Sequence, residues 1–313
     1  MIITRRHPLR FYFTLLLSSA FFFGMPIMLF WLSSTPEGQE DPIATMAMLL
    51  FAIVLFLLGI YTWYKYLKNV PIIKIQKDYI QFGSDIYMQE DVEYVDLWGK
   101  KDFPFLISHP MEAASIRFKD GTVRYMFGDL YTNSWEVKSY LETVFIKKET
   151  YHPPHRKATK DHLMSSGEFQ AFKQPQLLTM RGISVWILPF IIMYLVSPEG
   201  AAPLGGMLAV AAFFIFWFIL GSWFMHYPSL SKKELIIQNH NFFWKKHVYP
   251  LDQVKEVVFE TQYRMPNCVR VIGTDHRNKL YPAGTLWDKD WWAFEEALEK
   301  KGIKVRNECV SRK

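Results

Sequence analysis

The chain has 313 residues, enough for two or more domains. Half of the residues are hydrophobic and 17% are aromatic, yet the mean hydropathy is only +0.01, so apolar and polar residues must lie in separate segments. The net charge of +6 would suit nucleic-acid binding, but many basic residues flank apolar segments, where they would orient membrane spans. Composition therefore favours a membrane protein with soluble domains and disfavours a nucleic-acid-binding protein.

Residues 1–69 predict a first membrane hairpin. The segment 11–33 carries no charge and exceeds the about 20 residues that cross a bilayer. Arg5, Arg6 and Arg10 precede it, but it is longer than the apolar core of a signal peptide and no A-x-A cleavage site follows. After a short acidic loop, a second apolar segment at about 44–64 ends in a border rich in Trp, Tyr and Lys, typical of the inner membrane surface.

Residues 70–148 predict a small antiparallel barrel or sandwich closed by a C-terminal helix. Apolar and charged residues alternate over 116–127, and Asp120-Gly121 interrupts the alternation, which is typical of a hairpin. Beyond Gly128 the apolar period becomes that of a helix, with Asn133 or Thr132 available as its cap. Several short strands followed by one helix indicate an α+β domain.

Residues 149–176 predict a linker, because they are rich in His, Pro, Lys, Ser and Gln and have no sustained period. His152, His155 and His162 lie in it. Zinc ligands need fixed tetrahedral geometry, which a Pro-interrupted segment does not provide, so we expect solvated histidines and no metal site. The two cysteines, Cys268 and Cys309, lack a C-x-x-C spacing and predict reduced thiols in the cytosol.

The second half of the chain repeats the first. Spans are predicted at 177–196 and 204–225 in a hairpin of residues 177–229, followed by a domain at 230–306 and a tail at 307–313. Asp120 corresponds to Asp275, an offset of 275 − 120 = 155, and Leu130 to Leu286, an offset of 286 − 130 = 156. A near-constant offset between two segments of dissimilar sequence indicates an internal duplication.

The chain resembles the bacterial pleckstrin-homology-like (PH-like) membrane proteins. The resemblance rests on Asp78-Tyr79-Ile80, on Glu90-Asp91-Val92-Glu93-Tyr94-Val95, on the Lys119-Asp120-Gly121 turn and on the helix at 135–145, with looser counterparts at 234–236 and 252–257. It implies two transmembrane hairpins, each followed by a PH-like domain, and binding at the membrane surface. It supplies no catalytic residues.

Enzymatic and transport functions are disfavoured by what the chain lacks. It has no G-x-S-x-G elbow, H-E-x-x-H pair or G-x-x-x-x-G-K-[ST] loop, and we expect no cofactor. The predicted spans contain no carboxylate to bind or relay ions. Their small residues instead suit close helix packing, notably Gly205, Gly206, Gly221 and Ser222.

Two aromatic and basic segments are candidate contacts for a partner or for lipid. The first is predicted as a connection between strands, with a counterpart downstream, and the second lies in a strand-like segment. The alternatives are that the aromatics of the first segment join the domain core and that the second is a solvated strand face. The residues are Trp98, Lys100, Lys101, Phe103 and Phe105, with Tyr263 and Arg264 as the counterpart, and Trp244, Lys245 and Lys246.

These observations predict a non-enzymatic, four-span protein of the bacterial inner (cytoplasmic) membrane, with both termini and both domains in the cytoplasm. The domains would bind a protein partner or anionic lipid headgroups and act as a scaffold; the oligomeric state is left open. Two alternatives are a toxin-immunity or envelope-stress membrane protein and a transporter or lipid-handling subunit. A neighbouring toxin gene would favour the former, and a deep polar cavity between the spans would favour the latter.

Overall fold

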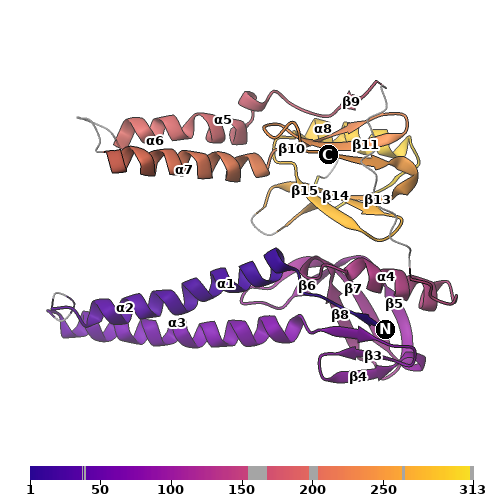
Figure 1. Cartoon of the computed structure of the whole chain (residues 1–313), viewed down its shortest axis with the longest axis horizontal. Coiled ribbons are helices and arrows are strands. Elements are labelled where there is room, and N and C mark those ends of the chain that lie inside the picture. The colour runs from indigo at the N-terminus through magenta and orange to yellow at the C-terminus, as the bar shows by residue number, and fades with distance from the viewer. Residues whose placement is uncertain (37, 39, 154–167, 197–203, 263–264, 311–313) are drawn as a thin grey trace. The chain divides into compact units, whose positions relative to one another are not determined.

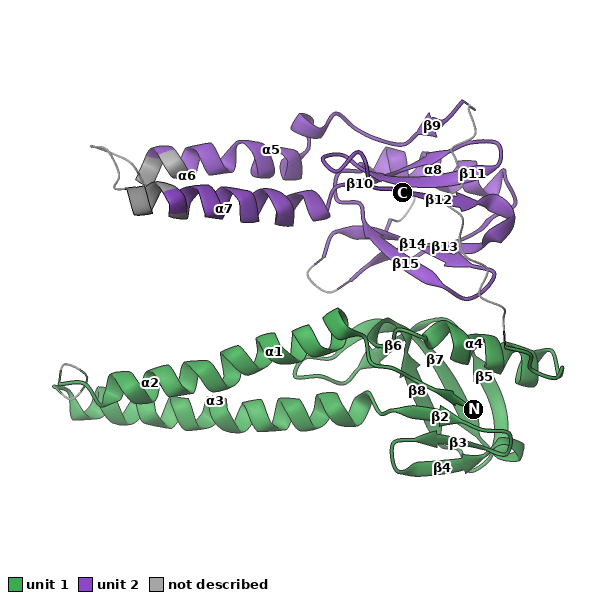
Figure 2. Ribbon diagram, in the orientation of Figure 1, with its two compact units in different colours: residues 1–153 green, residues 154–313 purple. Residues whose placement is uncertain are grey.

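The computed structural model describes residues 1–36, 38, 40–153, 168–196, 204–262 and 265–310. The chain divides into two compact units, Met1–Pro153 and Pro154–Lys313 (Figure 2). Each unit has an arm of apolar helices and a β domain with a helix near its C-terminal end (Figure 1). The expected α+β class, with apolar helices and antiparallel sheets, is confirmed.

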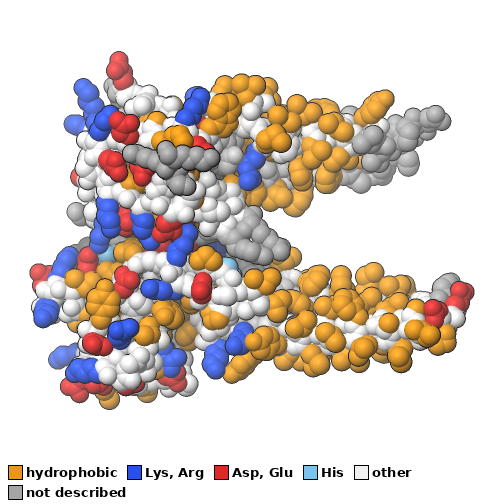
Figure 3. Space-filling model, turned by 180° about the vertical axis from the view of Figure 1, so that it is seen from behind, with side chains coloured by type: hydrophobic (Ala, Val, Ile, Leu, Met, Phe, Trp, Pro, Cys, Tyr) orange, Lys and Arg blue, Asp and Glu red, His pale blue; other side chains and the backbone are white. Residues whose placement is uncertain are grey.

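The arm of the first unit is a pair of long helices. The first helical stretch, Pro8–Ser33, comprises η1 (Pro8–Phe13), α1 (Thr14–Ser19), η2 (Ala20–Gly24) and α2 (Met25–Ser33); the second is α3 (Pro42–Asn69). Their most apolar windows reach mean hydropathies of 2.0 and 2.8, but only 6% and 17% of these windows is buried by protein. Hydrophobic side chains thus cover the outside of the arm (Figure 3), and both helices are long and apolar enough to cross a membrane.

The arm of the second unit is built from shorter helices: α5 (Met180–Trp186), α6 (Leu188–Val196) and α7 (Leu204–Trp223). Within the described residues only the two helices of the first arm meet the length and hydropathy required of a span, whereas the sequence predicts four. One cause is Pro189, which has no N–H to donate to the carbonyl of Val185 and interrupts the helix between α5 and α6. The loop predicted at 197–203 lies outside the described residues.

The first sheet of the first unit contains strands from both sides of the helical arm. Its order is β1-β2-β3-β4, and Ile2 pairs with Ile75 while Ile3 pairs with Lys74. β1 precedes the helices and β2 follows them, so the arm is inserted between two neighbouring strands of one sheet. The sequence predicts a domain that starts only at residue 70. The strands are β1 (Ile2–Ile3), β2 (Ile73–Ile75), β3 (Tyr79–Phe82) and β4 (Asp85–Met88).

The second sheet of the first unit centres on β7, which pairs with β5, β6 and β8. The predicted hairpin is confirmed as β7 and β8, and its turn places Gly121 at a φ of +82°, a conformation that favours glycine. The predicted helix is also present, but the Asn133 side chain does not cap it. The elements are η4 (Gln89–Asp91), β5 (Val92–Asp96), β6 (Lys100–Phe103), β7 (His109–Phe118), β8 (Val123–Phe127), η5 (Gly128–Leu130), α4 (Ser134–Leu141) and η6 (Glu142–Ile146).

The second unit has a similar order of elements, except that its described residues include no strand matching β6 and that a strand, β16, follows its helix. A strand before its helices, β9, pairs with β10 after them, so its arm is also inserted into a sheet, β12-β11-β10-β9. β9 lies in the segment predicted as a linker. A second sheet, β15-β14-β13-β16, ends in a strand parallel to β13. The elements are β9 (Gln170–Ala171), η7 (Gln176–Leu178), β10 (His226–Leu230), β11 (Glu234–Asn239), β12 (Lys246–Pro250), η8 (Leu251–Gln253), β13 (Val254–Thr261), β14 (Asn267–Gly273), β15 (Asn278–Pro282), α8 (Asp288–Glu299) and β16 (Lys304–Asn307).

Each β domain has its own hydrophobic core. In the first unit, Phe11 and Tyr66 of the helical arm belong to the same buried cluster as Val137 and Leu141 of α4. The feet of the helices therefore share the core of the domain. In the second unit the core gathers around β13, β14 and α8, and its largest members are Trp291, Phe294, Phe259 and Tyr281.

Thr4 joins the segment before the arm to the segment after it. Its backbone N–H donates to the carbonyl of Ile73 at 2.9 Å, and its hydroxyl accepts from the N–H of Ile73 at 2.8 Å, with both residues buried. We expect Thr4→Val to lower the free energy of unfolding by about 1–2 kcal/mol, because a buried N–H loses its acceptor. Thr4→Ser keeps the hydroxyl and should cost much less. Urea unfolding in detergent compares them, and equal losses would contradict this role.

Candidate membrane-facing sites

The feet of the first arm are fastened to the domain by polar contacts. Arg10 Nη1 lies 2.9 Å from Asp129 Oδ1, and Arg6 Nη2 donates to the carbonyl of Val70 at 2.8 Å. The Tyr131 hydroxyl donates to the carbonyl of Pro71 at 2.6 Å. Burial raises the pKa of Tyr131, so its hydroxyl keeps the proton that it donates. The helices and the β domain are thus held in a fixed relation.

A groove of about 830 Å³ opens beside the foot of α3. Four cations line it, against the carboxylates of Asp85 and Asp102. Arg124 is paired with Asp85 and also donates to the Tyr87 hydroxyl at 2.7 Å. Within the described part of the chain, Lys74 forms no ion pair. The charge of Lys74 could therefore neutralise one anionic group bound in the groove, beside the C-terminal end of α3. The cations are Arg6, Lys68, Lys74 and Arg124.

The aromatics of the segment predicted as a contact loop turn inward. Phe103 is 1% exposed in the core, and the Phe105 ring lies 5.5 Å from that of Tyr66. The Lys138 ammonium lies 3.1 Å from the centre of the half-buried Trp98 ring, a cation–π contact. Phe103 is thus withdrawn from any contact surface. Lys100 and Lys101 are half-buried in β6, where they pair with Glu112 and Met111 of β7.

The exposed apolar side chains of this region lie just beyond the predicted segment. Leu106 and Ile107 are 44% and 58% exposed. Asn69 at the end of α3 donates to the carbonyl of Pro104 at 2.8 Å, which holds the loop beside the foot of the helix. These two residues were not predicted as contacts, although they form an apolar pair directly after Phe105 in the sequence.

The second predicted segment lies on the surface. Trp244 is 63% exposed, and Lys245 and Lys246 are also exposed. The neighbouring Phe243, which was not predicted, is 70% exposed. The structure places all four at the turn between β11 and β12 and at the start of β12. Tyr263 and Arg264, the predicted counterpart of the first segment, lie outside the described residues.

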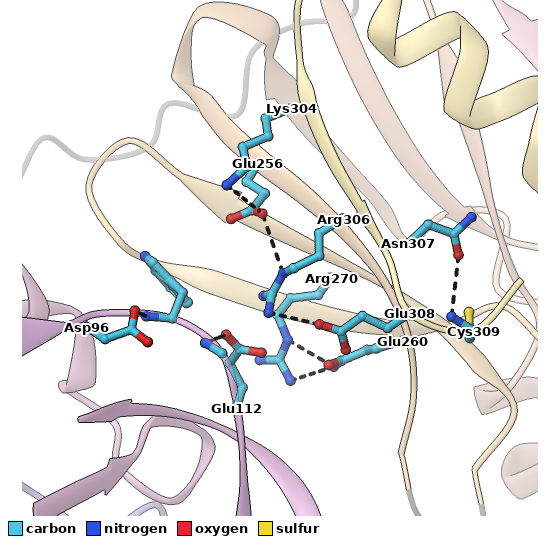
Figure 4. Close-up of polar contacts among 12 residues, drawn as sticks. Asp96, Glu112, Glu256, Glu260, Arg270, Lys304, Arg306, Asn307, Glu308 and Cys309 are labelled. Atoms are coloured by element: carbon cyan, nitrogen blue, oxygen red, sulfur yellow. Dashed lines mark hydrogen bonds and ion pairs between the residues drawn. The ribbon is translucent and has the colours of Figure 1, made fainter. Parts of the chain in front are cut away.

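One buried ion pair in the second unit joins two strands of its β sheet and does not form an open site (Figure 4). Glu260 Oε1 of β13 accepts from Arg270 Nε and Nη2 of β14 at 2.9 and 2.7 Å, and the two side chains are 1% and 0% exposed. Less buried ion pairs join Glu256 of β13 to Lys304 and Arg306 of β16, and Arg306 also pairs with Glu308, which follows β16. Among the described residues, no group of three His, Cys, Asp or Glu could hold a metal ion.

Two histidines flank Tyr281 in the second unit. The His226 and His247 rings lie 5.5 and 5.2 Å from the Tyr281 ring. Burial lowers the pKa of His226 to about 4 against the opposing effect of its hydrogen bond to Pro282. Burial and then the charge of Lys279 lower the pKa of His247 to about 4. Both imidazoles are therefore neutral near pH 7.

These histidines predict a loss of stability in acid. The folded pKa of about 4 lies below the ordinary 6.5, so the unfolded chain binds more protons between pH 6.5 and pH 4. Stability should fall as the pH falls through this window. We expect a lower melting temperature at pH 5 than at pH 7 in detergent, and a smaller difference in a His226→Gln, His247→Gln variant. An equal pH dependence in the two proteins would refute the assignment.

Comparison of the chain with protein-family models finds no match, and comparisons with curated proteins and with solved structures find none either. The fold and the geometry of these sites are therefore the basis for a functional proposal.

Proposed function

We propose that the chain is a non-enzymatic scaffold of the bacterial inner membrane, with four spans and two cytoplasmic PH-like domains that bind a protein partner or anionic lipid. The observation that carries this proposal is the insertion of each apolar arm between neighbouring strands of a sheet. A domain whose first strand lies before the arm and whose remaining strands lie after it is held at the membrane surface. Basic side chains at the feet of the first arm, among them Arg10 and Lys68, favour the cytoplasmic side.

The second arm supports a second hairpin, although its described helices are short. Phe190 of α6 and Ile215 and Phe216 of α7 are 61–63% exposed, so protein does not cover them. Val185 of α5 packs where Gly221 of α7 has no side chain, as small residues allow in membrane helix pairs. The 20 residues of α7 would rise about 30 Å, the thickness of the hydrocarbon core.

The shared order of elements supports both the PH-like fold and the duplication. In each unit one strand, an apolar arm, three strands, an antiparallel hairpin of a second sheet and a helix follow one another, and in the second unit the parallel strand β16 comes after the helix. The hairpins β7–β8 and β14–β15, each followed by α4 or α8, occupy the positions that the offset of about 155 residues predicts. Two sheets closed by one helix agree with the domain that the resemblance implies.

The groove beside α3 is the proposed binding site. Its excess of cations suits an acidic partner segment or a lipid phosphate. Attachment to the membrane raises the effective concentration of such a partner at the site, so a weak individual contact becomes a useful one.

Photocrosslinking in native membranes tests this role. A photoreactive phenylalanine analogue replaces Ser84 at the groove or, as a control, Asp120 in the β7–β8 turn. We expect a partner adduct at Ser84, as a gel shift for a protein or a mass increase for a lipid, and none at Asp120. The proposal is refuted by equal labelling of both positions, or by a purified protein that turns over a substrate through clustered polar residues.

A further inference from the structure

We propose that the turn at residues 240–245 is a membrane anchor, in which Phe243 and Trp244 enter the headgroup region of the bilayer and Lys245 and Lys246 bind lipid phosphates. This inference deepens the proposed function and rests on it, because it requires that α7 crosses the membrane. The ligand class is an anionic phospholipid surface.

The turn is built on the end of α7. Asn241 Nδ2 donates to Ser222 Oγ at 2.6 Å, and Asn239 Nδ2 donates to the carbonyl of Ser222 at 2.7 Å. The ring of Phe242 lies 6.3 Å from that of Phe218, one turn earlier in the helix. These contacts fix the position of the turn relative to the apolar helix, so its tip does not depend on a flexible connection.

The backbone of the turn is also held in place. Asn239 Oδ1 accepts from the N–H groups of Asn241 and Phe242 at 3.0 and 2.9 Å, and Lys245 N donates to the carbonyl of Phe242 at 2.8 Å. The side chain at 239 is itself 1% exposed. A rigid turn that presents two aromatic rings to the outside is preorganised for a surface and loses little entropy on binding.

The exposed rings extend the apolar surface of the helix. Phe243 and Trp244 are 70% and 63% exposed, and their ring centroids are 5.1 Å apart. The last two turns of α7 expose Ile219, Leu220 and Trp223, at 44–57%. The same apolar surrounding that covers the helix would therefore continue onto the turn, which favours lipid over a separate protein partner. Trp is enriched at this depth because its ring suits the interface.

The charges beside the rings have one sign. Residues 235–251 contain no Asp or Glu, and Lys245 and Lys246 follow Trp244 directly. The Lys245 ammonium lies 5.1 Å from the centre of the Phe242 ring, close to the end of α7. Exposed lysines next to interfacial aromatics attract anionic headgroups. In the first unit the turn between β3 and β4 is Gly83-Ser84 and has no aromatic side chain, so this anchor belongs to the second unit.

The test measures depth in the bilayer with an environment-sensitive fluorophore on single cysteines. The full chain, with Cys268→Ser and Cys309→Ser, carries the label at Trp244→Cys, at Ile215→Cys in α7, or at Asp252→Cys, which is exposed at the other end of β12. Each protein is reconstituted in nanodiscs of phosphatidylcholine and phosphatidylglycerol. Quenching is compared between nitroxides high on the acyl chain, nitroxides deep on the acyl chain, and aqueous iodide.

We expect the label at 244 to be quenched at least about twofold more by the shallow nitroxide than by iodide, as for a group about 5–10 Å deep. The label at 252 should respond only to iodide. Quenching of 215 by the deep nitroxide while 244 responds to iodide alone would overturn the anchor and leave the span intact. No lipid quenching at 215 would refute the proposed second hairpin itself.

A label at 244 that is shielded from iodide and from every nitroxide would mean that protein covers the turn, which also overturns the proposal. If the Trp244→Cys protein does not fold, Phe243→Cys gives the same readout. Replacing phosphatidylglycerol by phosphatidylcholine should weaken the shallow quenching, because Lys245 and Lys246 lose their anionic partners. An unchanged signal would remove the phosphate contact from the proposal.

Discussion

Arg270→Met is expected to lower the free energy of unfolding by about 3–5 kcal/mol, because it leaves the Glu260 carboxylate in the protein interior without its guanidinium. Two hydrogen bonds, at 2.7 and 2.9 Å, join these side chains, and neither is more than 1% exposed. A methionine fills much of the space of the arginine stem but supplies no charge. Urea unfolding of the full chain in detergent micelles, followed by circular dichroism, measures the loss.

Two further variants separate charge from packing. The double variant Glu260→Met, Arg270→Met should recover most of the lost stability, because no buried charge is then left behind. Arg277→Met removes an exposed ion pair with Asp275, at 41% and 50% exposure, and should cost less than about 1 kcal/mol. If Arg270→Met and Arg277→Met cost the same, the buried pair is not what stabilises this sheet.

Gly221→Leu is expected to destabilise the second arm by about 3 kcal/mol, near the upper end for an overpacked contact. A Cβ at position 221 would collide with Cγ2 of Val185, which is buried and stiff about χ1. The two helices must then separate. Thermal unfolding in detergent, read by size-exclusion chromatography after heating, measures the effect.

Gly24→Leu is the matched control for a glycine in an apolar helix. A Cβ at position 24 has no heavy atom within 4 Å, so this substitution should leave the melting temperature close to that of the unsubstituted chain. Equal effects of Gly24→Leu and Gly221→Leu would mean that general loss of a glycine, and not contact between α5 and α7, determines the stability of the arm.

The periodic parts of the fold could be predicted from the sequence. A change in the period of the apolar residues predicts the hairpin around Asp120-Gly121 and the helix after it. The length and apolar composition of the first two hydrophobic segments predict the first two helices. The strands β1 and β9 could not be found in this way, because two residues define no period. Ile2 and Ile3 become a strand only by pairing with Lys74 and Ile75, about 70 residues away.

Side-chain contacts explain the remaining differences. Asn133 stands at the predicted cap position, but its Oδ1 accepts from Arg5 N at 2.8 Å and its Nδ2 donates to the carbonyl of Ile3 at 2.9 Å. Its partners thus lie in β1 and just after it, in a segment for which the sequence predicts no strand. Pro189 likewise interrupts the third predicted span, although the hydropathy of this segment is that of one continuous apolar helix.

The candidate contact residues divide by burial, which composition does not encode. Phe103 and Trp244 belong to segments of similar aromatic and basic composition, yet Phe103 is 1% exposed and Trp244 is 63% exposed. Phe103 lies on a strand whose inner face meets the core, while Trp244 lies in a turn beyond the end of its sheet. The exposed neighbours Leu106 and Phe243 extend both regions and were not among the predicted residues.

The proposed insertion of a membrane hairpin into each β domain is tested most directly by topology reporters. Alkaline phosphatase and green fluorescent protein are fused in turn after Gly38, Lys148, Gly200 and Lys313. We expect phosphatase activity at Gly38 and Gly200, and fluorescence at Lys148 and Lys313, because both arms must leave and re-enter the cytoplasm between paired strands. Phosphatase activity at Lys148 or Lys313, or fluorescence at Gly38 or Gly200, would contradict this account.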